Sequence, residues 1–374
     1  MKKLLAAILA AILALTLFAC KITLKEPGVL LSGENDTIEQ TENTTQAAAE
    51  TTEETTDDVT TISPEGNLAN LVDERFELIA LIFRLAGHAE YAVSESEYMG
   101  WGSDYENYHL ALKKFEKYKR HPAVLYAANL DISGSNIVSY AIHIKEDLSG
   151  LFEDISAISG SMFADWTEES AAEFCSLALD FRADTGFADF FRSNVPFYRA
   201  LCEPFLNDEV VSGIDIGWWM TIAERFGFEY TAKRHNYRYI VSPSIYRACM
   251  NAHNSDTVYA AMVAFLGRAQ DNRGMSALLV HEYNHSFGTA AGIDAYMTNE
   301  KFAGWVEDSK PEYDLYDDPI TVAVEYMVRA YTILYFEDHG YGDIASLCMG
   351  IDKEQGFDYI EQVYELVLEL EGRK

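Results

Sequence analysis

The chain has 374 residues, of which 49% are hydrophobic and 13% aromatic, enough for one large folded domain or two ordinary ones. It carries 60 acidic and 28 basic residues, a formal net charge of −32. Because such an acidic chain repels phosphate backbones and anionic membrane surfaces, the composition argues against a nucleic-acid-binding protein.

The first 19 residues have the pattern of a bacterial lipoprotein signal peptide. Lys2 and Lys3 precede an apolar run, Leu4–Phe18, that is too short to span a membrane and is typical of a secretory signal. The run leads into the sequence LFAC, which resembles a lipobox and implies that Cys20 is the first mature residue and carries the lipid. Acyl chains on Cys20 would anchor the protein outside the cytoplasm, on the cell membrane. An ordinary secretory signal that contains a cysteine is the alternative.

Residues 20–66 are rich in Thr and Glu and have no hydrophobic periodicity. Such a segment cannot bury enough apolar surface to fold, so we expect a disordered tether. Its like charges would extend it. The sequence therefore predicts one domain, residues 67–374, held at some distance from the membrane.

Four further cysteines are widely spaced and include no C-x-x-C pair: Cys175, Cys202, Cys249 and Cys348. They do not indicate a zinc cluster. Disulfides, which form outside the cytoplasm, and buried free thiols are both consistent with this spacing.

Helical periodicity dominates the first part of the domain, residues 67 to about 230. Apolar spacing predicts a helix from Leu71 to Leu85 that stops at Gly87, and a second helix closed by His121–Pro122. The second helix is expected at 105–120. Four more helices are expected at 134–147, 167–182, 186–205 and 212–227.

The pattern changes in the second part, residues 231–374. The sequence YRYIVSPS at 237–244 predicts a short strand, and the apolar segment 256–267 fits a strand or a helix, of which we favour the strand. Helices are expected at 273–288, 318–340 and 357–374. The expected fold class is α+β, dominated by helices, with a small sheet before residue 273.

The sequence LLVHEYNHSF, residues 278–287, contains His281, Glu282 and His285 in the spacing H-E-x-x-H. On a helix the two histidines lie one turn apart and face the same way, so both imidazoles can bind one Zn²⁺ ion. Glu282 is turned about 100° away from His281. It can stand beside the metal without binding it and act as acid/base toward the attacking water and the leaving amine. A pair of core histidines bonded to backbone or tyrosine groups is the alternative.

A catalytic zinc site needs a third protein ligand. The metzincin pattern H-E-x-x-H-x-x-G-x-x-H fails at its last histidine, where this chain has Ala291, although Asp294 follows three residues later. We favour Glu325, because only two charged residues lie between Ile320 and Phe336 of an apolar predicted helix. Asp294 as the ligand, or a simple ion pair between Glu325 and Arg329, is the alternative.

An H-E-x-x-H helix followed by a second helix with a glutamate resembles the gluzincin clan of metalloproteases. More narrowly, the segments LIFRLAGHAEY, HPAV, HEYNHSF, VEYMVRAY and EQGFDYI resemble a family of bacterial, often lipid-anchored proteins of unknown function that are predicted zinc proteases. This resemblance covers most of the chain from about residue 67 onward. It implies a zincin-like fold with Zn²⁺ as cofactor, His281, His285 and Glu325 as metal ligands, and Glu282 as catalytic acid/base.

The chain departs from thermolysin-like gluzincins at Arg329. Those enzymes have an aspartate four residues after the ligand glutamate, where it supports a metal-binding histidine. Here a supporting carboxylate must come from elsewhere or be absent. Candidates for the group that stabilises the oxyanion are Tyr335, His339 and Tyr341.

These patterns together predict a lipid-anchored, extracytoplasmic zinc peptidase that acts on a peptide or protein substrate. A non-catalytic lipoprotein that uses a zincin fold as a binding module is the alternative. A hydrolase that cleaves another amide bond, such as one in cell-wall peptide, is a third candidate function.

Overall fold

The computed structural model describes residues 72–88, 103–130, 140–151, 166–206, 208–215, 217–218, 221–222, 236–244, 249–253, 257–263, 272–285, 296–309 and 319–374. The expected signal peptide, Cys20 and the tether lie outside these residues, as does Asp294. Within the described part of the chain, no helix is long and apolar enough to cross a membrane.

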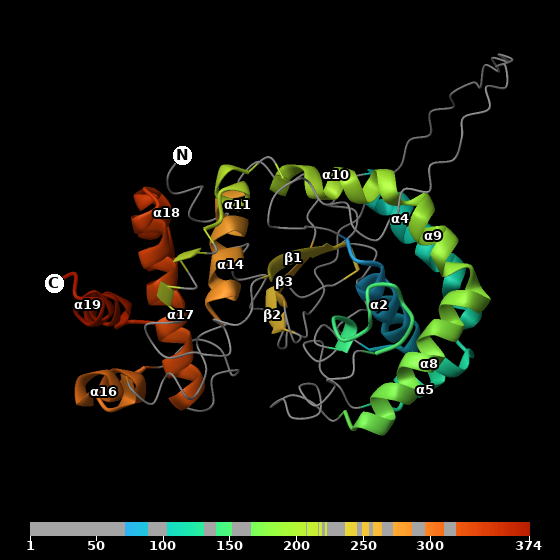
Figure 1. Cartoon of the computed structure of the whole chain (residues 1–374), viewed down its shortest axis with the longest axis horizontal. Coiled ribbons are helices and arrows are strands. Elements are labelled where there is room, and N and C mark those ends of the chain that lie inside the picture. The colour runs from blue at the N-terminus through green and yellow to red at the C-terminus, as the bar shows by residue number, and fades with distance from the viewer. Residues whose placement is uncertain are drawn as a thin grey trace, which may run out of the picture.

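The first part of the described chain is helical. Its elements are α2 (Glu74–Ala86), α4 (Ser103–Lys113), the 3-10 helix η2 (Lys114–Tyr118), α5 (Pro122–Ala127), α8 (Glu168–Thr185), α9 (Phe187–Ser193), α10 (Val195–Leu206) and α11 (Glu209–Ser212). In Figure 1, α8, α9 and α10 follow one another along a curve, and α2 lies on its inner side. The apolar helix α2 packs against α5 and α8, which makes it the centre of this helical group.

The bounds of α2 follow from its first and last residues. The side chain of Asp73 accepts a hydrogen bond from the backbone N–H of Arg75 at 2.9 Å and so caps the N-terminus. Gly87 ends the helix with a φ of 89°, a left-handed conformation that a residue without a Cβ atom adopts readily. The predicted helix with its stop at Gly87 is confirmed, although it starts at Glu74.

Other predicted helices are present with different bounds. The stretch 105–120 forms α4 and η2, and 167–182 lies within α8. The stretch 186–205 is divided into α9 and α10 near Pro196, which has no N–H for a helical hydrogen bond. The helix expected at 212–227 begins only after Asp215 in the described residues.

The prediction of a helix at 134–147 is wrong for residues 142–147, which are not helical. Ile144 instead forms an isolated antiparallel bridge with Leu151. Between them, the side chain of Asp147 accepts a hydrogen bond from the backbone N–H of Ser149 at 3.0 Å. A short polar side chain that binds the backbone two residues on competes with helix formation, so the chain turns here.

Three described strands form one small sheet: β1 (Asn236–Ser242), β2 (Cys249–His253) and β3 (Thr257–Val263). The strand order is β1-β3-β2, with β3 parallel to β1 and antiparallel to β2. The two predicted strands correspond to β1 and β3 and are confirmed. Strand β2 was not predicted.

The rest of the described chain is helical again, with α14 (Asn272–Asn284), α16 (Glu300–Asp308), α17 (Pro319–Asp338), α18 (Gly342–Glu354) and α19 (Ile360–Leu370). Helix α14 packs against β2 and β3 on one side and against α17 on another. Helix α17 also contacts α16, α18 and α19, so most of its residues are buried. Figure 1 shows α14 between the sheet and these last helices. The helix-dominated fold with a small sheet before α14 is thus confirmed.

Three of the cysteines are buried free thiols: Cys175, Cys202 and Cys348. Burial raises the pKa of Cys175 and of Cys202 to about 11, so both stay protonated near neutral pH. Such thiols behave as small apolar core residues. The side chain of Cys249, in β2, lies outside the description.

Candidate metal centre

Helix α14 carries His281 near its C-terminal end, and His285 of the H-E-x-x-H sequence directly follows the helix. The helix ends at Asn284, earlier than the expected Gly288, and His285 lies in the turn that follows. The backbone N–H of His285 still donates to the carbonyl oxygens of His281, at 3.3 Å, and Glu282, at 3.2 Å. His285 therefore keeps the helical register, and its imidazole faces the same way as that of His281.

A buried hydrogen bond joins α14 to α17 beside this turn. The side-chain amide of Asn284 donates to the hydroxyl oxygen of Thr332 at 2.8 Å. The Thr332 hydroxyl in turn donates to the backbone oxygen of Val328, also at 2.8 Å. Because all three residues are buried, this chain of bonds fixes α14 against the helix that carries Glu325.

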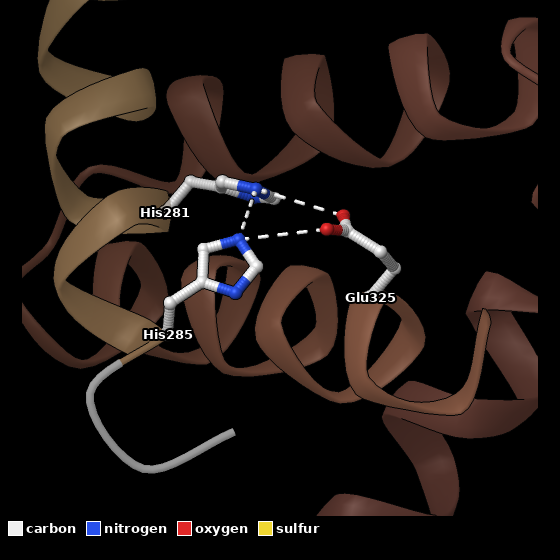
Figure 2. A group of neighbouring side chains, drawn as sticks. All are labelled: His281, His285 and Glu325. Carbon is white, nitrogen blue, oxygen red and sulfur yellow. Dashed lines mark hydrogen bonds and ion pairs between the residues drawn. The ribbon is translucent and has the colours of Figure 1, made fainter. Parts of the chain in front are cut away.

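His281, His285 and Glu325 meet between the two helices, and Figure 2 shows both imidazoles and the carboxylate turned toward one another. The Nε2 atoms of the two histidines are 3.2 Å apart. Glu325 places Oε2 3.7 Å from His281 Nε2 and Oε1 3.5 Å from His285 Nε2. Helix α14 and the turn that follows it thus supply two nitrogen donors, and α17 supplies the oxygen donor opposite them.

These separations fit a tetrahedral metal site. Ligand atoms about 2.1 Å from a zinc ion at the corners of a tetrahedron lie about 3.4 Å from one another. The three separations of 3.2, 3.5 and 3.7 Å scatter around that value. Two imidazole nitrogens with one carboxylate oxygen are a donor set that zinc and neighbouring transition metals accept.

The electrostatics of the site suit metal binding as well. Burial, together with the neighbouring His285 and Arg329, holds the pKa of His281 well below its ordinary value. Burial also lowers the pKa of His285, against the opposing effect of the Glu325 carboxylate. Both imidazoles are therefore neutral near pH 7, the form that binds a metal through nitrogen.

The position of Glu325 distinguishes a metal site from a pair of core histidines that bind only each other. The 3.2 Å between the two imidazoles would also fit a hydrogen bond from one neutral ring to the other. That bond leaves the carboxylate turned toward the two rings without a hydrogen bond to its buried Oε2 atom within the described residues. The nearest cation to Oε2 in the described chain is Arg329, 3.4 Å away, so the carboxylate has room for a metal ion on the side of the histidines.

The proposed acid/base Glu282 lies directly after His281 on α14 and is 7% exposed. The side chains of the two histidines are 15% and 23% exposed, so the centre is largely buried but retains some access to solvent. Asp294, the alternative third ligand, lies outside the described residues.

Arg329 follows Glu325 by one helical turn on α17 and lies next to its carboxylate. Its Nε atom lies 3.4 Å from Glu325 Oε2. Its Nη1 atom donates to the buried carboxylate of Asp352 and, at 3.0 Å, to Gln355 Oε1. The ion pair between Glu325 and Arg329 is therefore present together with the histidine cluster, and a second carboxylate shares the arginine. The sequence patterns did not single out Asp352 or Gln355.

The candidates for oxyanion stabilisation do not lie at this centre. Tyr335 is ten residues beyond Glu325 on α17, about 15 Å along the helix axis. Its hydroxyl oxygen accepts a hydrogen bond from the backbone N–H of Asp215 at 3.1 Å. His339 lies further still and places Nε2 3.4 Å from the Asp215 carboxylate. Tyr341 follows α17 altogether. Tyr335 and His339 thus tie the segment around Asp215 to the end of α17.

In comparisons with known proteins, no family model, no curated protein sequence and no solved structure matches this chain. The case for function therefore rests on the geometry of this centre and on the sequence patterns.

Proposed function

We propose that the protein is a zinc-dependent peptidase with a zincin-like, gluzincin-type centre. The observation that supports it is the convergence of His281, His285 and Glu325 from two helices, at separations that fit a tetrahedral ion. Three protein ligands with one open position are typical of catalytic zinc sites, whereas structural sites have four. Bound there, zinc would supply a Lewis acid that lowers the pKa of water and polarises a carbonyl group.

Different residues at this centre would bind the metal and transfer the proton. The two imidazoles and the Glu325 carboxylate would hold the ion. Glu282, next to a ligand but rotated away from it on α14, would receive the proton of the attacking water and pass it to the departing amine.

The peptide substrate and the cellular location are also parts of this proposal. A peptide bond is the substrate that the resemblance to gluzincins implies and that a zinc ion with a neighbouring glutamate can hydrolyse. The lipobox-like sequence before Cys20 supports a lipid-anchored protein that acts outside the cytoplasm.

The proposal is tested on the purified full chain without its signal peptide. Metal analysis after gel filtration is expected to give one equivalent of zinc, and a broad peptide library is expected to be cleaved. Chelation should abolish cleavage and added Zn²⁺ should restore it. A chain that holds one zinc and cleaves no peptide would contradict the peptidase and favour a binding protein; a chain without zinc would contradict the metal centre itself.

A further inference from the structure

We propose that Asp352 is a positioning residue for the metal centre: it holds Arg329 so that Arg329 cannot take the Glu325 carboxylate away from a metal. The inference rests on the proposed metal centre and extends it to α18, a helix that carries none of the three ligands. It explains why the buried charges of Arg329 and Asp352 lie next to Glu325.

Arg329 is held by three residues of α18 and the turn that follows. Its Nη1 atom donates to the Asp352 carboxylate and to Gln355 Oε1. Its guanidinium carbon lies 4.1 Å from the centre of the Phe357 ring, a cation–π contact. Arg329, Asp352 and Gln355 are each 5% exposed or less, so water replaces none of these contacts easily.

This arrangement limits what Arg329 does to Glu325. An arginine and a carboxylate usually pair through two parallel N–H···O bonds, and that pairing occupies both carboxylate oxygens. Here Nε lies 3.4 Å from Glu325 Oε2, and among the residues that the structure describes the Oε2 atom has no hydrogen-bond partner. Nη1 is engaged by Asp352 and Gln355, so it takes no part in such a pairing, and both oxygens of Glu325 are turned toward the histidines (Figure 2).

The charges support the same conclusion. Arg329 lies between two buried carboxylates, those of Glu325 and Asp352. If Asp352 were neutral, the full attraction of the guanidinium would fall on Glu325, and Arg329 would compete with a metal ion for it. With Asp352 charged, one carboxylate balances the arginine and the other remains available as a metal ligand.

The test measures Zn²⁺ affinity of the full chain, by competition with a chromophoric chelator, in the wild type and three variants. D352N is expected to bind zinc about 10 to 100-fold more weakly, as loss of a residue behind a metal ligand commonly does. R329Q/D352N, which removes both charges of the pair, is expected to return to within about threefold of the wild type. The control is E354Q, an exposed acid on the same helix, whose affinity should not change.

The double variant separates positioning from a merely structural role. If Asp352 only stabilised the fold, removing Arg329 as well would not restore zinc binding. Equal affinity of D352N and wild type, or equal weakness of D352N and R329Q/D352N, would overturn the inference. A wild-type chain without zinc is a different result, because it overturns the metal centre on which the inference rests.

D352N leaves a buried arginine partly unpaired, so its folding is checked by circular dichroism. If it does not fold, Q355A replaces it, because this change removes one acceptor of Arg329 Nη1 and no charge. Q355A is expected to weaken zinc binding in the same direction by a smaller factor. Unchanged zinc affinity in a folded Q355A would overturn the inference.

Discussion

Glu77 of α2 accepts a hydrogen bond from the hydroxyl of Ser242, the last residue of β1, at 2.5 Å. The hydroxyls of Ser244 and Tyr108 donate to the same buried carboxylate, at 2.5 and 2.6 Å. Three hydroxyl donors from two other parts of the chain thus meet one carboxylate. The contact joins the first helical group to the sheet that supports α14.

The free energy of unfolding should carry a pH dependence from Glu77. Burial raises the pKa of Glu77 above its ordinary value, although the three hydroxyl hydrogen bonds oppose the shift. The folded protein therefore binds this proton more tightly than the unfolded chain does. The resulting stability is present below the unfolded pKa and is lost as the pH rises through the folded pKa.

We expect the wild type to lose stability relative to E77Q as the pH rises from about 4 to about 8, because the glutamine stays neutral. Urea unfolding of both proteins across this range measures the difference. E106Q, which changes an exposed acid on α4, is the control and should show no comparable trend against the wild type. A difference between wild type and E77Q that stays constant with pH would contradict the raised pKa.

Asn284 should contribute measurably to stability, because its amide joins α14 to Thr332 of α17. N284A removes a buried hydrogen bond and leaves a cavity, so we expect it to cost about 1–3 kcal/mol in the free energy of unfolding. Thr332 keeps its own bond to the backbone oxygen of Val328 in this variant. N129A, which deletes an exposed amide bonded to the Leu125 carbonyl, should cost less than about 0.5 kcal/mol. Equal effects of the two changes would contradict this role.

Local signals made much of this fold predictable. Gly87 ends α2 as expected, and the apolar sequence around Glu325 forms the buried helix α17. The approach of His281 and His285 follows from their spacing on a helix alone. The approach of Glu325 to them was inferred from a single acidic residue in an apolar stretch, and the structure brings these groups together.

Contacts between distant parts of the chain were not predictable in this way. Glu77 and Ser242 are 165 residues apart, and neither one signals the other. Asp352 was missed because α18 was not predicted, although the helix has a readable pattern. Its buried residues include Ile344, Cys348 and Ile351, and Asp352 lies on the same face. An acid on an apolar helix face requires a partner, and that requirement was the available signal.

Lipidation at Cys20 is tested by C20S. Without the thiol there is no acceptor for a lipid, so the variant should be released from the membrane fraction or accumulate as an uncleaved precursor. Cell fractionation and mass spectrometry of the N-terminal peptide measure both outcomes. Unchanged fractionation of C20S, together with an unmodified Cys20 in the wild type, would contradict the lipid anchor.

Glu282 should be needed for catalysis and not for metal binding. E282Q keeps the size of the side chain and removes the base, so we expect full zinc content and a loss of about 10²–10⁴-fold in kcat. Metal analysis and peptide cleavage are measured on the same preparation. Wild-type cleavage by E282Q, or loss of its zinc, would show that the role assigned to Glu282 is wrong.

The third ligand decides the class of the centre. Two histidines alone hold zinc weakly, and Glu325 places a carboxylate oxygen 3.5 Å from His285 Nε2. E325A should therefore lose zinc as readily as H281A does, whereas D294A should keep it. The measurement is zinc per chain after dialysis against a mild chelator, with circular dichroism to confirm that each variant is folded.

E325Q sharpens this comparison, because the amide keeps the shape of the side chain but removes the charge that compensates the cation. It should retain less zinc than the wild type and lose it faster. If E325A and E325Q keep a full equivalent of zinc while D294A loses it, the ligand comes from the stretch after residue 288. The gluzincin-type assignment would then be wrong, and the role proposed for Asp352 behind Glu325 would fail with it.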